Sequence, residues 1–289
     1  MKHKLQLRTD FCDEMIVKEH HDDTISCTVT KKGQCQITKV EVKSEKNLLQ
    51  KEIGTYITIE YETLQDYAMR MEIEEAMKEE LRLLFNKLTS DCQRVLVVGL
   101  GNRDMVSDAL GPKCADHIMV TAHFYRENKE DFLQGTRDVA VVSPGVMGQT
   151  GLESATIVEQ IVKLYEPDLV LVIDALATSS ITRINRAIQI SDNGIKPGSG
   201  VGNHRHELSE KTLHRPVIAI GVATVTSIGT ILEEGLVKLK QEEMLKAINE
   251  VMDLNLVVTP KNMDSELHYL ITIIAEALNH VLHPDYANL

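Results

Sequence analysis

Short apolar segments that alternate with helical pattern constrain the fold of this 289-residue chain more than any other feature. The segments 95–98 and 168–173 are rich in Val, Leu and Ile, as buried parallel strands are. The expected order is strand, helix, strand, helix, strand over 95–98, about 110–124, 138–142, 152–165 and 168–173. This alternation indicates right-handed βαβ units and a parallel sheet.

The rest of the chain completes an α/β fold. Further strands are expected at 216–222 and, antiparallel and short, at 187–191; helices are expected at 65–88, about 224–250 and about 264–282. Residues 24–62 alternate apolar and polar side chains and predict a small β-rich section beside the main sheet. We therefore expect a parallel-sheet, three-layer α/β/α core with a small N-terminal β-rich appendage.

Composition excludes several classes of function. The 43 acidic and 31 basic residues give a net charge of −12, which argues against nucleic acid as a partner. Five cysteines without CxxC spacing favour a reducing cytoplasm over a disulfide framework or a zinc ribbon. The chain start lacks an apolar signal region and no stretch is long enough to span a membrane, so we expect no membrane association.

Acidic residues follow two of the expected strands. Asp108 lies in the loop 99–112 after the first, and Asp174 follows 168–173 directly. The carboxyl ends of parallel strands share the edge of the sheet where ligands bind, so we expect Asp108 and Asp174 to face one another across a cleft. The alternative is that Asp108 caps the next helix and Asp174 forms a salt bridge at a strand end.

A pair of carboxylates has a specific chemistry. Two such charges about 4 Å apart repel by about 4 kcal/mol at an effective dielectric constant near 20. One is then protonated while the other stays ionised, which provides an acid and a base for activating water against a peptide carbonyl.

Other motifs point less clearly to chemistry. Gly99-Leu100-Gly101 begins like a dinucleotide-binding loop, but Asp104 stands at the sixth position, where an anion would repel a pyrophosphate. Gly198-Ser199-Gly200 lacks the outer glycines of a nucleophile elbow, and no activating partner is evident for the cysteines. His204 and His206 could bind a metal on a strand, or face substrate or solvent without one.

Two loops are expected to border the cleft. The loop 143–151 contains Gly145 and Gly148, which permit close approach of a bound chain. Free N–H groups at the start of the next helix could stabilise an oxyanion. The alternative is a plain strand-to-helix turn. The long connection after Asp174 includes the glycine-rich run 193–203. The candidate cleft residues are Asn102, Gly145, Gly148, Ser199 and Asn203.

Segments spread in order over nearly the whole chain resemble one protein family. They are GLGNRDMVSDALGPK (99–113), SPGVMGQTGLES (143–154), LVLVIDALA (169–177), IQISDNGIKPGSGVGNHRHELS (188–209), PVIAIGVATV (216–225) and VVTPKNMD (257–264). They closely resemble the germination endopeptidases, or spore proteases, of spore-forming bacteria, whose fold is similar to that of hydrogenase maturation proteases.

The resemblance implies an aspartic-type endopeptidase without a cofactor, made as a self-processing zymogen and assembled as a homotetramer in the cytoplasm of the spore core. Its substrates would be the small acid-soluble spore proteins, degraded at germination. The catalytic aspartates of the family match Asp108 and Asp174. Two alternatives stay open: a metal-reading endopeptidase like the hydrogenase maturation proteases, and a non-catalytic spore binding protein.

The chain departs from the family pattern at a few positions. Thr178-Ser179-Ser180 stands where a basic residue is expected, His204 and His206 stand where Lys or Arg is usual, and Ala223 replaces a proline. These changes bear on substrate preference and pH response rather than on the type of reaction.

The amino terminus resembles the self-processing site of the family. An acidic residue, a large apolar one and a small one are expected around the cut, and Asp10, Phe11 and Cys12 meet that order, although Leu7 replaces an upstream acidic residue. A cut after Asp10 would divide the chain into a propeptide, 1–10, and a single α/β protease domain, 11–289. We expect the short polar segment to be accessible to a neighbouring subunit; a frayed tail that is never removed is the alternative.

Overall fold

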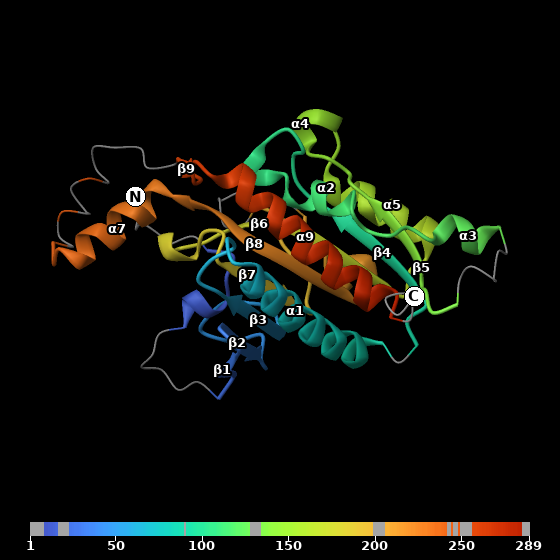
Figure 1. Cartoon of the computed structure of the whole chain (residues 1–289), viewed down its shortest axis with the longest axis horizontal. Helices are drawn as coiled ribbons and strands as arrows, with labels where there is room; N and C mark the ends of the chain where they lie inside the picture. The colour runs from blue at the N-terminus through green and yellow to red at the C-terminus, as the bar shows by residue number, and fades with distance from the viewer. Residues whose placement is uncertain are drawn as a thin grey trace.

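A single mixed sheet organises the chain (Figure 1). The computed structural model describes residues 9–16, 23–89, 91–127, 134–198, 206–241, 244, 248 and 256–284. Within these residues the sheet has nine strands in the order β1-β2-β3-β7-β8-β6-β4-β5, with β9 paired to β8. The strands are β1 (Ile25–Lys32), β2 (Cys35–Val42), β3 (Gly54–Glu60), β4 (Arg94–Gly99), β5 (Asp138–Val142), β6 (Leu169–Ala177), β7 (Ala187–Ser191), β8 (Val217–Ser227) and β9 (Val257–Val258).

One half of the sheet is parallel, as the βαβ order predicts. Strand β4 pairs in parallel with β5 and β6, and β6 pairs in parallel with β8. The carboxyl ends of these strands therefore lie along one edge of the sheet.

The other half is antiparallel and continuous with the first. Strands β1, β2 and β3 form a meander, β3 pairs with β7, and β7 pairs with β8. The β-rich appendage predicted over residues 24–62 is thus an extension of the central sheet. In its register, Gln189 of β7 lies between Thr58 of β3 and Gly221 of β8.

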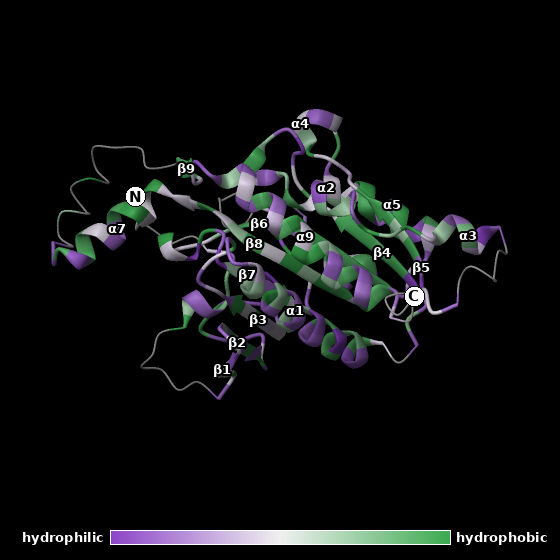
Figure 2. Ribbon diagram, viewed as in Figure 1, coloured by the Kyte–Doolittle hydropathy of each residue, from purple (hydrophilic) through white to green (hydrophobic). Residues whose placement is uncertain are grey.

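Helices cover both faces of the sheet and give the expected three layers. The helices α1 (Tyr67–Leu88), α2 (Leu110–Ala115) and α9 (Met263–Leu282) pack on one face, and Figure 1 shows α1 and α9 side by side. On the other face, α5 (Ser154–Tyr165) packs against β4 and β6. Figure 2 shows the hydrophobic residues of β4 and α5 and the hydrophilic outer turns of α1. Shorter helices are α3 (Ala122–Arg126), α4 (Met147–Thr150), α6 (Glu210–Leu213) and α7 (Ile228–Lys238).

Some boundaries differ from the sequence-based expectation. The helix expected over about 110–124 is divided into α2 and α3, because Thr121 bonds to β5: its amide donates to the Val139 carbonyl and its hydroxyl accepts from the Val139 amide. Strand β6 continues to Ala177 instead of ending before Asp174, because it pairs with β8 over that length. Helix α7 ends at Lys238, short of the expected boundary near 250.

None of the helices in the described ranges combines the length and hydropathy that a membrane span needs.

Candidate active site

The loop from β4 to α2 carries Asp108 and is closed by a glycine. Asp108 ends a short 3-10 turn, Val106–Asp108. The Asn102 amide donates to its Oδ2 at 2.8 Å. Gly101 has φ of +115°, and a Cβ there would lie 2.0 Å from the Asp108 carbonyl oxygen. The Gly99-Leu100-Gly101 motif therefore has a steric role, which is to let the loop fold back onto Asp108.

Asp174 lies inside β6 rather than at its end. The residue is 5% exposed, and its Oδ1 accepts a hydrogen bond from the Ala175 amide at 2.9 Å. Its partner in the register of β8 is Gly221. A carboxyl group this deeply buried needs polar partners or a charged neighbour to remain ionised.

Asp108 and Asp174 line the same cavity, which has a volume of about 480 Å³. Other lining residues include Thr224 of β8, His206 in the loop before α6 and Thr259 after β9. The Thr224 hydroxyl donates to the Ser107 carbonyl at 2.8 Å and ties the Asp108 loop to β8. The structure thus brings the two predicted aspartates to one cavity at the carboxyl end of the parallel strands.

The other predicted cleft residues have different positions. Asn102 supports Asp108, and its side-chain oxygen accepts from Gln149 Nε2 at 2.8 Å, which connects the 143–151 loop to the Asp108 loop. Gly145 and Gly148 are not among the residues lining the cavity, and a Cβ at Gly148 would meet no atom within 4 Å. Ser199 and Asn203, like His204, lie outside the described residues.

The amino-terminal segment enters the same site. Asp10 lines the cavity together with Asp108 and Asp174. Its amide donates to the Ala177 carbonyl at 3.0 Å, and its Oδ2 accepts from the Ala177 amide at 2.8 Å. Phe11 is 0% exposed and packs against Leu176, Ala187 and Ala223. Residues 1–8, on which the expected accessibility of the tail depends, lie outside the described part; the residue after the expected cut, Phe11, belongs to a packed segment.

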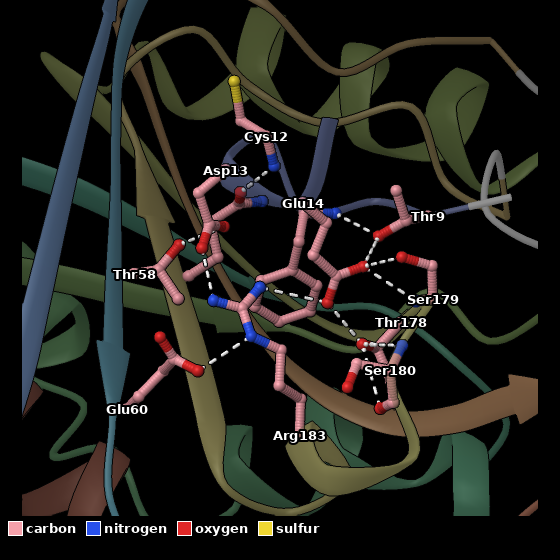
Figure 3. A network of polar contacts seen from close by, with 12 residues as sticks. Thr9, Cys12, Asp13, Glu14, Thr58, Glu60, Thr178, Ser179, Ser180 and Arg183 are labelled. Carbon is pink, nitrogen blue, oxygen red and sulfur yellow. Dashed lines mark hydrogen bonds and ion pairs between the residues drawn. The ribbon is translucent and has the colours of Figure 1, made fainter. Parts of the chain in front are cut away.

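A partly buried ionic cluster holds the residues that follow Phe11 (Figure 3). The Arg183 guanidinium forms ion pairs with Asp13, with Glu14 at 3.0 Å and with Glu60 of β3 at 2.8 Å. Glu14 also accepts from the Thr178 hydroxyl at 2.5 Å and from the Ser179 amide and hydroxyl at 2.7 Å. Thr178 and Ser179, two of the three hydroxyl residues expected to depart from the family pattern, therefore bind the amino-terminal segment.

The cluster perturbs the acid–base properties of its members. Burial alone would raise the pKa of Glu14, but hydrogen bonds from Thr178, Thr9 and Ser179 outweigh it and hold that pKa below its ordinary value. Burial would lower the pKa of Arg183, but its bonds to Glu60 and Asp13 raise it. Both groups are therefore held in their charged forms.

Asp10 also lines a second cavity, of about 400 Å³. Lys51 and Gln189 line it, and both donate to the Asp10 carbonyl oxygen. Sequence reasoning missed Lys51, Gln189 and Arg183, since their partners are far away along the chain. The one available signal was the strand pattern of 187–191, which places Gln189 in the sheet but does not identify what it binds.

Thiol and metal chemistry have less support. Burial raises the pKa of Cys12 to about 12 and those of Cys35 and Cys92 to about 11, so these thiols are not activated nucleophiles. Among the residues that the structure describes, no group of three or more His, Cys, Asp or Glu side chains is arranged to hold a metal ion. His206 lines the cavity of the two aspartates.

Comparison with known proteins identifies the family. The family model described as germination protease matches residues 6–237. The chain is 37% identical to the germination protease of Clostridium acetobutylicum, over 97% of this chain and 94% of that protein, and 37% identical to that of Oceanobacillus iheyensis, over 86% and 83%. A solved [NiFe] hydrogenase maturation protease from Thermococcus kodakarensis is 18% identical over 69% of this chain and 98% of its own, with a TM-score of 0.36. The family match and the 37% identity over most of each chain show that this chain is a peptidase and belongs to the germination protease family.

Proposed function

We propose that this peptidase is an aspartic-type endopeptidase of spore germination in which Asp108 and Asp174 act as the acid–base pair. One observation carries the assignment: both residues line one cavity at the carboxyl end of the parallel strands. This edge is where open α/β sheets bind their ligands.

The reaction uses the two carboxyl groups in different protonation states. The ionised member takes a proton from a water molecule as the water oxygen attacks the carbonyl carbon of the substrate. The tetrahedral intermediate then collapses, the C–N bond breaks, and the leaving nitrogen takes its proton from the other carboxyl group. The products are a new carboxyl terminus and a new amino terminus, and the pair is restored by proton exchange with solvent.

The substrates of this activity are the small acid-soluble spore proteins, degraded in the cytoplasm of the spore core by a homotetramer. Membership of the germination protease family supports the spore setting. The chain has 43 acidic and 31 basic residues, and this net negative charge supports a protein substrate rather than a nucleic acid.

The enzyme is made as a zymogen that cuts its own chain after Asp10. The location of Asp10 in the cavity of Asp108 and Asp174 supports this assignment and favours cleavage within one chain. The burial of Phe11 makes the same bond hard for a neighbouring subunit to reach. The propeptide, residues 1–10, would leave and Phe11 would become the new terminus.

The test compares Asp108→Asn and Asp174→Asn with a matched control. An amide keeps the shape of the carboxyl group but cannot serve as acid or base, so each variant should lose at least about 10²- to 10⁴-fold in cleavage rate. Asp116→Asn is the control, since Asp116 lies at the end of α2 and pairs with the exposed Arg103.

The rates would be measured on a purified small acid-soluble spore protein, with circular dichroism to verify the fold. Full activity in Asp108→Asn or Asp174→Asn would exclude that residue from the mechanism. An equal loss in Asp116→Asn would mean that any change of charge near the loop abolishes activity.

A further inference from the structure

We infer that Lys51 and Gln189 form the oxyanion-binding site for cleavage of the bond between Asp10 and Phe11. This inference rests on the self-processing proposed above, and it assigns a catalytic role to two residues outside the aspartate pair.

The Asp10 carbonyl oxygen receives two side-chain hydrogen bonds. Lys51 Nζ donates at 2.9 Å and Gln189 Nε2 donates at 3.2 Å. The first donor is a cation and the second a neutral amide, so negative charge that develops on this oxygen would be stabilised by both. Backbone carbonyls in proteins are mostly paired with backbone amides, and a carbonyl held by a lysine and a glutamine is unusual.

Gln189 holds the chain on both sides of Phe11. Its Nε2 donates to the Asp10 carbonyl, and its Oε1 accepts from the Cys12 amide at 2.8 Å. The residue lies on β7, between β3 and β8, and is only 8% exposed. A rigid central strand therefore fixes the orientation of the bond to be cut.

Lys51 is positioned by the loop between β2 and β3. The Asn47 side chain donates to the carbonyls of Ser44 and Lys51, both at 2.8 Å, and accepts from the Lys51 amide at 3.2 Å. These bonds fix the loop backbone at Lys51, whose side chain extends to the Asp10 carbonyl.

The donors and the acids approach Asp10 from two cavities. Lys51 and Gln189 line the cavity of about 400 Å³, and Asp108 and Asp174 line the cavity of about 480 Å³. Asp10 lines both. Asp10 thus borders one space with carboxyl groups and one with hydrogen-bond donors, and hydrolysis of its peptide bond needs both kinds of group.

The step is a hydrolysis. A water oxygen bonds to the Asp10 carbonyl carbon, its proton passes to the ionised member of the aspartate pair, and the π electrons move onto the Asp10 oxygen, where Lys51 and Gln189 bind the charge. Collapse re-forms the C=O bond and breaks the bond to the Phe11 nitrogen, which takes a proton from the other aspartate. One peptide bond and one water give one carboxyl group and one amine.

The experiment measures how fast the full-length chain loses residues 1–10, by mass spectrometry, in the wild type and in three variants. Lys51→Met should slow the loss by about 10²- to 10³-fold, as removal of an oxyanion donor does. Gln189→Leu should slow it less, because its bond is longer and uncharged. Lys51→Arg should retain more activity than Lys51→Met because it keeps the cation.

The control is Lys211→Met, which removes a neighbouring lysine that pairs with Glu52 at 2.6 Å. It should cleave at the wild-type rate. A second measurement separates catalysis from docking: in the Asp108→Asn background, hydrogen exchange of the Phe11 and Cys12 amides is compared with and without Lys51→Met. Unchanged protection is expected.

Three outcomes would overturn the inference. Cleavage of Lys51→Met at the wild-type rate, with no cleavage of Asp108→Asn, would reject the oxyanion role alone and leave the proposed function intact. Loss of amide protection in the Lys51→Met background would make Lys51 a docking residue. A wild-type chain that cuts spore protein but keeps residues 1–10 would reject self-processing, and the inference with it.

Discussion

The two halves of the sheet contribute differently to the candidate site. The parallel half, around β4, β6 and β8, carries Asp108 and Asp174 at its carboxyl edge. The antiparallel half supplies Gln189 from β7 and Lys51 from the β2–β3 loop, and both bind the Asp10 carbonyl. Under the proposed self-processing, we therefore expect the acids of one half to act on a bond whose carbonyl oxygen is bound by residues of the other half.

The difference also has an electrostatic side. The parallel half brings carboxyl groups together, whereas a cation outside it, Arg183, holds the amino-terminal segment through Asp13 and Glu14. Removing the carboxyl groups and removing Arg183 should therefore give distinct phenotypes, with lost chemistry in the first case and a released segment in the second.

Arg183→Leu is expected to have the largest effect on how tightly the amino-terminal segment is held against the rest of the chain. This change leaves Asp13 and Glu14, whose side chains are 7% and 6% exposed, without their cation. Removing one partner of a buried ion pair costs about 3–5 kcal/mol. Native-state hydrogen exchange of the Cys12 amide should show the free energy of local opening reduced by about that amount.

The matched control is Arg103→Leu, which breaks an exposed pair with Asp116 and should cost less than about 1 kcal/mol. If Arg183→Leu left the protection of Cys12 unchanged, the ionic cluster would not be what holds the segment.

A smaller effect, confined to the parallel half, is expected from Gly101→Ala. The left-handed backbone and the contact of 2.0 Å with the Asp108 carbonyl strain the loop by about 1–3 kcal/mol. Thermal unfolding should show this loss, together with slower cleavage because Asp108 moves.

Gly235→Ala in α7 is the control, since a methyl group added there would meet no atom within 4 Å and Ala favours a helix. A Gly101→Ala enzyme with wild-type activity would show that the position of Asp108 tolerates a shifted loop.

The smallest effect concerns pH. Hydrogen bonds lower the folded pKa of Glu14 from its ordinary value of 4.5. Such a group contributes stability that is fully present above 4.5 and is lost as the pH falls through the folded pKa. Protection of the Cys12 amide should therefore decrease as the pH falls below 4.5 in the wild type. In Glu14→Gln, protection of the Cys12 amide should be weaker at neutral pH and should not decrease further below pH 4.5. A variant whose protection depends on pH as in the wild type would show that Glu14 does not stabilise the segment.

Sequence reasoning predicted the parallel half well, since its strands are short apolar runs between helices. It expected Asp108 and Asp174 at one edge of the sheet, and in the structure both line one cavity. It ended β6 too early, because the pairing of Asp174 with Gly221 depends on a strand that is distant in the sequence.

The antiparallel half was harder to predict in its function. Gln189, Lys51 and Asp10 meet only in the folded chain, and no local pattern connects them. The polar residues Thr178 and Ser179 were noticed as departures from the family, but their role became clear only from their hydrogen bonds to Glu14. Long-range polar contacts of this kind have no periodicity in the sequence.

The central claim is that each chain holds its own Asp10–Phe11 bond between the two halves of its sheet. Co-expression of the wild type with a carboxyl-terminally tagged Asp108→Asn chain tests it, because the tag lets the two chains be separated by mass after they have been made in the same cell. Amino-terminal sequencing should find Phe11 at the start of wild-type chains and residues 1–10 still present on the tagged chains. Tagged chains that begin at Phe11 would show cleavage by a neighbouring subunit and contradict the claim.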